Sequence, residues 1–132
     1  MTQPANPVTA IFTDQASPPG GHYSQAVVHG GLVFVSGQLG FEPGTLDKRA
    51  DSVEQETRNC LTNLARILEA SGSSLQRLVK VTIYISDVGY WPVVNRIYGE
   101  YLGDHKPARA IVPCGLLHHG FHVEIEAVAA TA

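Results

Sequence analysis

Residues 52–72 read SVEQETRNCLTNLARILEASG, and this stretch predicts the first of two helices in the chain. Ser52 and Gln55 form a capping box, in which each side chain satisfies a free backbone N–H at the start of the helix. Gly72 supplies the stop signal. Side chains at helical spacing give the helix one face that can pack on a sheet, namely Val53, Thr57, Cys60, Leu61, Leu64, Ile67 and Leu68.

The residues that follow predict a strand and then a second helix. Residues 79–86 read VKVTIYIS, with apolar side chains at every second position, which is typical of a strand with one buried face. The second helix is expected over residues 90–102, with Pro92 in its first turn and Gly103 at its end. Its apolar stripe comprises Trp91, Val94, Ile97, Tyr98 and Tyr101.

Further strands are expected on both sides of this unit. Residues 8–12 are a short apolar run, and residues 24–28 and 32–35 flank Gly30-Gly31 as a hairpin. Two more strands are expected, one from about residue 109 and one over 122–130. The order β-β-β-α-β-α-β-β predicts an α+β fold, a mixed sheet with both helices on one face. A chain this short leaves the other face open, so we expect self-association into a closed ring.

Length and charge narrow the class of protein. The 132 residues suit one domain spanning residues 1–132, and 44% of them are hydrophobic, which is enough for a core. Nine basic residues are spread along a chain of net charge −3, which argues against a nucleic-acid partner. The start, Met1 to Pro4, lacks the features of a signal peptide, and no stretch reaches the ~20 apolar residues of a membrane span. We therefore expect a cytoplasmic protein without membrane contact, in which Cys60 is packed and forms no disulfide with Cys114.

Two charged positions are candidates for chemistry. Arg109 follows Pro107 at the start of an expected strand, and its planar guanidinium suits a carboxylate ligand. A surface salt bridge is the other interpretation, and the pattern alone favours it. Glu124 and Glu126 lie two residues apart on the last strand, so both point to one face. That face is either a solvated outer surface or one where a carboxylate orients water or moves a proton.

Several other positions carry residues that could form a site. Ser36-Gly37 ends a buried strand, where the glycine allows a ligand to approach the backbone or simply ends the strand in a turn. His118, His119 and His122 do not complete a recognisable metal set, and we expect no metal. Cys114 has no signature of a nucleophile around it. No nucleotide-binding motif is present in the sequence.

The chain resembles the reactive intermediate deaminase (Rid, also called YjgF) family from about Phe12 to Ala130. The resemblance rests on the joint order of several short stretches, and each of them alone is weak. They are Tyr23-Ser24-Gln25-Ala26, Val35-Ser36-Gly37-Gln38, residues 59–68, residues 70–75, Val79-Lys80-Val81-Thr82, Val94-Asn95, His105-Lys106-Pro107-Ala108-Arg109 and Val123-Glu124-Ile125-Glu126-Ala127.

This resemblance implies a chorismate-mutase-like homotrimer with active sites between subunits, and hydrolysis of reactive 2-enamines or 2-imines to 2-keto acids and ammonia without a cofactor. It implies that Arg109 binds the substrate carboxylate, Glu124 holds the attacking water and Tyr23 lines the pocket. It places Ser36 and Gly37 against the ligand, the Ile111 carbonyl near the water, and Trp91 close to the pocket. A keto-acid-binding trimer without catalysis, or an RNA-directed activity, is the alternative function.

The sequence departs from the family pattern at several positions. Ala110 stands where many deaminating members have Ser or Thr, and residues 113–117 read PCGLL in place of a Val-Ala-Arg-Leu-Pro pattern. His22 and Gly40 both stand where a proline is usual. The altered loop makes a larger or differently shaped imine conceivable as the substrate.

Overall fold

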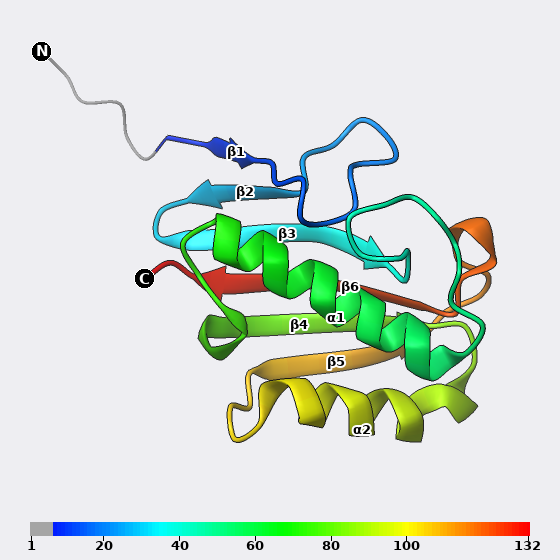
Figure 1. Ribbon diagram of the computed structural model, residues 1–132. Coiled ribbons are helices and arrows are strands. Elements are labelled where there is room, and N and C mark those ends of the chain that lie inside the picture. The colour runs from blue at the N-terminus through cyan, green and yellow to red at the C-terminus, as the bar shows by residue number, and fades with distance from the viewer. Residues whose placement is uncertain (1–6) are drawn as a thin grey trace, which may run out of the picture.

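The computed structural model describes residues 7–132, which form one six-stranded sheet and two helices (Figure 1). The segment Met1 to Pro4, on which the signal-peptide prediction rests, lies outside these residues. The strands are β1 (Thr9–Ile11), β2 (Ala26–His29), β3 (Leu32–Leu39), β4 (Leu78–Ile85), β5 (Ala108–Pro113) and β6 (Val123–Ala130). The helices are α1 (Val53–Ala70) and α2 (Trp91–Leu102), with short 3₁₀ turns η1 (Leu75–Arg77), η2 (Val88–Tyr90) and η3 (His118–Gly120).

The sheet is mixed, as predicted. Its strand order is β1-β2-β3-β6-β4-β5, in which only β4 and β5 pair in parallel. The predicted order of strands and helices is confirmed, and so is the hairpin, because Gly30 and Gly31 both have positive φ between β2 and β3. Strand β5 lies at one edge of the sheet, and this edge carries part of the candidate site.

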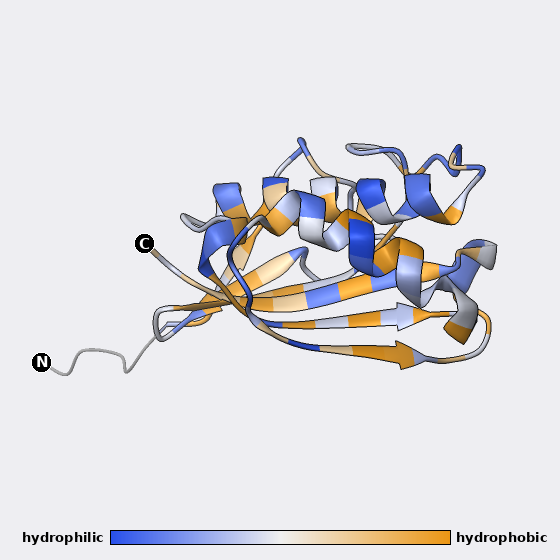
Figure 2. Ribbon diagram, turned by 90° about the horizontal axis from the view of Figure 1, so that it is seen from below, coloured by the Kyte–Doolittle hydropathy of each residue, from blue (hydrophilic) through white to orange (hydrophobic). Residues whose placement is uncertain are grey.

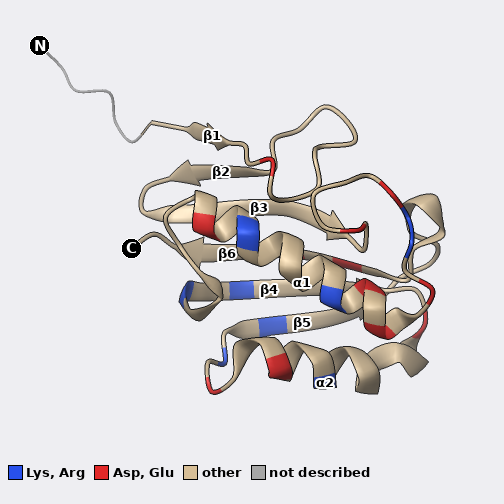
Figure 3. Ribbon diagram, in the orientation of Figure 1, with Lys and Arg blue, Asp and Glu red and all other residues tan. Residues whose placement is uncertain are grey.

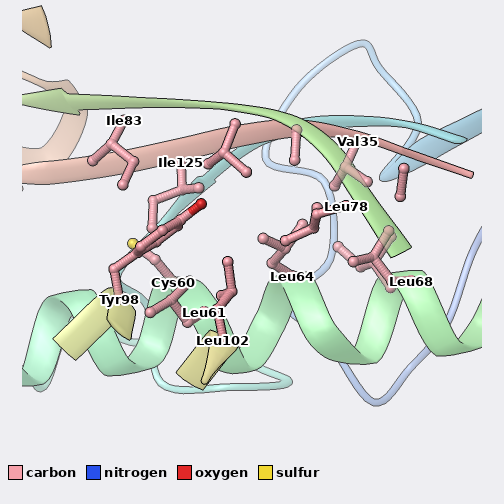
Figure 4. Packing of buried hydrophobic residues seen from close by; sticks show 14 of the residues in the cluster. Val35, Cys60, Leu61, Leu64, Leu68, Leu78, Ile83, Tyr98, Leu102 and Ile125 are labelled. Atoms are coloured by element: carbon pink, nitrogen blue, oxygen red, sulfur yellow. The ribbon is translucent and has the colours of Figure 1, made fainter. Parts of the chain in front are cut away.

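Helix α1 begins and ends where the sequence predicts, but the capping box is only half formed, because the Gln55 side chain donates to the Asn59 Oδ1 at 3.0 Å instead of reaching back to the Ser52 N–H. The Ser52 side chain accepts a hydrogen bond from the Gln55 backbone N–H at 3.1 Å. Gly72 follows the last turn with φ +77°. Figure 4 shows Cys60, Leu61, Leu64 and Leu68 of α1 reaching toward side chains of the sheet. Cys60 is fully buried and, like Cys114, is a free thiol, as expected.

Both helices lie on the same side of the sheet, and the opposite face has no cover (Figure 2). That open face carries partly exposed apolar side chains on β3 and β5, with Leu32 at 36%, Phe34 at 43% and Val112 at 38% of full exposure. Among residues 7–132, neither helix is long and apolar enough to cross a membrane. The exposed side chains of Leu32, Phe34 and Val112 make the open face of the sheet a surface on which another protein could pack.

Two side chains expected in the core lie outside it. Val79 is 47% exposed because a β-bulge between Leu78 and Lys80 shifts the alternation, so that Leu78 is buried in its place. Trp91 belongs to the expected apolar stripe of α2 but is 43% exposed and lies beside Arg109. The central stripe residues Val94 and Ile97 are buried, as predicted.

Gln25 is a buried polar residue that fixes the loop before β2. Its side chain accepts a hydrogen bond from the Thr13 N–H at 2.7 Å and donates to the carbonyls of Thr13 and Ser17 at 3.0 and 2.9 Å. Gln25→Leu is expected to lower the free energy of unfolding by about 2–4 kcal/mol, because three backbone groups lose their partner. A urea titration measures this change. The exposed Gln15→Leu is the control, and an equal effect of both substitutions would contradict the role of Gln25.

Candidate functional site

A bulge in β3 shapes the first part of the site. Between Val35 and Gln38 the register with β6 shifts, so Ser36 and Gly37 are the irregular residues, at the place where the sequence predicts close approach to the backbone. The carboxylate of Glu124 lies directly over Gly37. A Cβ atom added to Gly37 would lie 3.0 Å from the Glu124 carboxyl carbon and would overlap Oε2. Only glycine leaves room for the carboxylate in this position.

This carboxylate opens into a cleft of about 490 Å³. Tyr23, Ser36, Gly37 and Glu124, four of the residues expected in the site, all line it. The remaining lining residues are Gly20, Gly21, Leu39, Phe41, Leu46, His118 and His119. The cleft thus combines an apolar wall with a few polar groups, as ligand sites commonly do.

Backbone hydrogen bonds hold two of the polar groups in place. The Ser36 hydroxyl donates to the Ser24 carbonyl at 2.6 Å, and the Tyr23 hydroxyl accepts from the Gly20 N–H at 3.1 Å. The Tyr23 ring is half-exposed at the mouth of the cleft. Ser36 and Tyr23 therefore form fixed walls rather than mobile ones.

Glu124 is half-buried, and burial raises its pKa above the ordinary range for glutamate. The positive form of His118 acts against this rise, while the like charge of Glu126 adds to it. Glu126 is itself engaged, because the Tyr84 hydroxyl donates to its Oε1 at 2.6 Å. Glu124 is therefore the carboxylate left to act on a ligand, and its raised pKa suits proton transfer.

Arg109 forms a second cluster at the β5 edge. Its Nη1 donates to the Asn95 Oδ1 at 2.9 Å, and its guanidinium carbon lies 4.8 Å from the Tyr98 ring centroid and 5.9 Å from that of Trp91. Among residues 7–132 the ion pairs do not include Arg109, so the surface salt bridge that the sequence pattern favours is absent. Its charge remains unneutralised and is held in position by α2.

The two clusters lie on opposite faces of the sheet. Arg109 pairs in register with Val81, which is buried on the helix side, whereas Glu124 alternates with buried Val123 and Ile125 and so points to the open side. Ile111 lies two residues beyond Arg109 on the same edge strand. One chain therefore brings Tyr23, Ser36, Gly37 and Glu124 together, and separately brings Arg109 and Trp91 together.

Asn95 is a further candidate site residue, to which the sequence did not point. Helical spacing gives a signal that could have identified it, since Trp91, Asn95 and Tyr98 lie on one face of α2. For metals, no group of three or more His, Cys, Asp or Glu side chains is arranged to hold an ion anywhere in residues 7–132.

Gly37→Ala is expected to lower the rate of any reaction that uses the Glu124 carboxylate by at least about tenfold. The new methyl group displaces this carboxylate, and a misplacement of about 1 Å is costly in catalysis. Circular dichroism and the urea midpoint check that the fold persists. Gly99→Ala, at a helical position with open space around the Cβ, is the control. Full activity of Gly37→Ala would show that the contact with Glu124 is unimportant.

The fold and the cleft define an α+β protein of the YjgF-like structural class, and solved structures agree. RidA from an Antarctic Psychrobacter is 35% identical, with a TM-score of 0.88 and coverage of 92% of this chain and 98% of that one. The Escherichia coli protein TdcF with bound serine is 29% identical, with a TM-score of 0.88 and coverage of 94% and 99%.

The sequence comparisons identify the family. The family model described as Endoribonuclease L-PSP matches residues 13–131. A RutC family protein of Pyrococcus horikoshii is 40% identical over 119 residues, which are 90% of this chain and 94% of that protein. The 2-iminobutanoate/2-iminopropanoate deaminase of Bos taurus is 37% identical over 90% of this chain and 87% of its own length. The chain belongs to the Rid (YjgF) family.

Proposed function

We propose that the protein hydrolyses reactive 2-imino acids, and the enamines that convert to them, to 2-keto acids and ammonia. The observation that carries this proposal is the Glu124 carboxylate, which is half-buried in a ligand-sized cleft and lies against the bulge at Gly37. The relative from Bos taurus, which carries the name of such a deaminase, supports the reaction class. The TdcF structure with bound serine supports a small ligand of amino-acid size.

Arg109 is the proposed partner of the substrate carboxylate. A guanidinium binds a carboxylate through two parallel hydrogen bonds, and Asn95 and the Tyr98 ring restrict its orientation here. Because Arg109 and Glu124 lie on opposite faces of one sheet, we propose that a second copy of the chain joins them in one site. Arg109 on the edge strand of one copy would then face the cleft of its neighbour.

The open face of the sheet supports this assembly. Leu32, Phe34 and Val112 expose apolar surface that a second copy would cover. A closed ring is the form in which identical copies bury one such face without leaving a free end. We propose a homotrimer, as the resemblance implies.

The reaction needs few groups. Arg109 fixes the carboxylate of the protonated imine, and a water between Glu124 and the imine carbon attacks that carbon. The water oxygen forms the new bond, the π electrons move to nitrogen, and Glu124 takes the water proton. The resulting carbinolamine loses its nitrogen as ammonia when a proton reaches it, and the hydroxyl becomes the ketone carbonyl. We propose no cofactor, because the imine carbon is already electrophilic.

The proposed alternatives have weaker support. An RNA-directed activity requires a basic surface, whereas acidic and basic residues are interspersed along α1 and α2 (Figure 3) and the net charge is −3. A trimer that only binds keto acids would need Arg109 but not the raised pKa of Glu124. The expectation of a cytoplasmic location stays a prediction, and one relative from Schizosaccharomyces pombe, 42% identical, is named as mitochondrial.

The test is ammonia release from 2-imino acids generated in situ by an amino-acid oxidase in excess. The protein should accelerate the release beyond the spontaneous rate in proportion to its concentration. Imines from alanine, leucine and phenylalanine would show whether the cleft prefers a small or a large side chain. A rate equal to the spontaneous rate with every imine would contradict the proposed function.

A further inference from the structure

His118 shares the cleft with Glu124 but has no part in the reaction described so far. It is the first residue of η3, in the loop that connects β5 to β6, and it lines the cleft together with Glu124, Ser36 and Tyr23. Its positive form lowers the pKa of Glu124, so the two groups interact through space. Within residues 7–132 the imidazole of His118 has no hydrogen-bond partner, which leaves both ring nitrogens available to a ligand.

The loop that carries His118 is fixed by its neighbours. Lys48 Nζ donates to the His119 carbonyl at 2.7 Å and lies 5.0 Å from the Phe121 ring centroid. His119 has φ +60° and its ring packs edge-on against Phe41 at 5.5 Å. Both histidines line the cleft, but they differ in their ring contacts. His119 joins the aromatic wall, while His118 remains unpartnered at the mouth of the cleft.

We propose that His118 is a catalytic residue that delivers the proton to the departing amine in the deamination. This inference rests on the proposed function. A general acid is required because the carbinolamine nitrogen leaves as ammonia only after it is protonated. Glu124 alone would have to accept a proton from water and return it to nitrogen. With a second proton donor in the cleft, Glu124 needs only to accept the proton from water.

The proton balance closes with these two groups. Glu124 accepts one proton from the attacking water, and the imidazolium of His118 donates one to the amine nitrogen. The carbon–nitrogen bond then breaks as the hydroxyl oxygen forms the carbonyl, and His118 takes the hydroxyl proton and is restored. The proton on Glu124 passes to the released ammonia, so the products are the keto acid and ammonium.

Several titratable groups lie near Glu124 and His118 and affect how the reaction rate depends on pH. Glu126 raises the pKa of Glu124, and its carboxylate accepts the Tyr84 hydroxyl. Lys48 contributes a fixed positive charge beside His119. The titratable groups near the pair are Tyr23 from the loop before β2, Tyr84 from β4, and His119 from the same loop as His118, while Lys48 from the loop before α1 is held at the His119 carbonyl.

Three variants separate proton transfer from charge. His118→Gln removes both the charge and the proton, while His118→Arg keeps a charge that arginine does not release as a proton. His29→Gln, an exposed histidine at the end of β2, is the matched control. Each is assayed by ammonia release between pH 5 and 9, with the spontaneous rate subtracted. NMR of ¹³C-labelled glutamate follows the titration of Glu124 in each protein.

The wild type is expected to show a bell-shaped profile of kcat/KM, with its descending limb set by the loss of the imidazolium proton. His118→Gln should lose this limb, lower kcat by about tenfold to a hundredfold, and move the Glu124 titration to higher pH. His118→Arg should leave the Glu124 titration near its wild-type position and yet stay slow. His29→Gln should match the wild type.

Two results would overturn the inference, and they differ in whether the proposed function survives. If the wild type deaminates and His118→Gln or His118→Arg keeps its rate and descending limb, His118 carries no proton to the amine, while the proposed function stands. If the wild type does not accelerate ammonia release with any imine, the proposed function fails and this inference fails with it.

Discussion

Arg109→Ala is expected to lower kcat/KM for 2-imino acids by about 10²–10³-fold. The substitution removes two charge-assisted hydrogen bonds to the substrate carboxylate, worth together about 3–4 kcal/mol. Arg109 is partly exposed, and within residues 7–132 its guanidinium donates a hydrogen bond to Asn95 alone, so the fold should persist. The measurement is initial ammonia release across imine concentrations, with sedimentation to check the assembly.

Two further variants define what Arg109 contributes. Arg109→Lys keeps the charge but loses the planar fork, so its activity should fall between those of wild type and Arg109→Ala. Arg96→Ala, also on the surface and paired only with Glu54 and Glu100, is the control and should retain activity. If the Arg109→Ala protein kept full activity, Arg109 would not bind the substrate.

Glu124→Gln is expected to lower kcat by about 10²–10⁴-fold, the usual contribution of a positioned acid–base group. The amide keeps the shape of the side chain over Gly37 but accepts no proton. Binding of a 2-keto acid, followed by calorimetry, should be nearly unchanged, because Arg109 supplies the charge for it. A trimer that only binds keto acids would show no turnover in the wild type and no change in the variant.

The same substitution is expected to raise stability at neutral pH. Burial raises the pKa of Glu124 in the folded protein, so ionising this group opposes folding. This cost is absent below the unfolded pKa of about 4.3, and it is fully present above the folded pKa. Glu124→Gln should therefore have a higher urea midpoint than wild type at pH 7, and the difference should vanish near pH 4. A lower midpoint at pH 7 would contradict the sign of the shift.

Local patterns were enough to predict the elements of the fold. The capping residues Ser52 and Gln55, the glycine pair at 30 and 31, and the alternation in β6 each act through neighbouring residues, so the sequence displays them directly. The exposure of Val79 was not predictable, because it depends on a bulge in the pairing of β4 with a strand over forty residues away. A β-bulge has no repeating pattern of residue types by which the sequence could reveal it.

Part of the candidate site was predictable as a group of residues that lie together, but its arrangement was not. Four of the residues expected in it, Tyr23, Ser36, Gly37 and Glu124, line one cleft. Arg109 lies apart because its strand is at the sheet edge and its side chain faces α2, which only the strand order and the register reveal. The sequence suggested His118 only as a metal ligand, because its place beside Glu124 depends on how the loop between β5 and β6 folds, and it did not point to Asn95, whose partner Arg109 lies on another element.

We propose that Arg109 of one copy and Glu124 of another act in the same site, and a mixing experiment tests this shared site most directly. Arg109→Ala and Glu124→Gln are each inactive alone, and the two are unfolded together and refolded as an equal mixture. Random assembly of a ring should give about one intact site in four, so activity should return to about a quarter of wild type. If both residues acted within one chain, every site would carry a defect and the mixture would stay as inactive as its components.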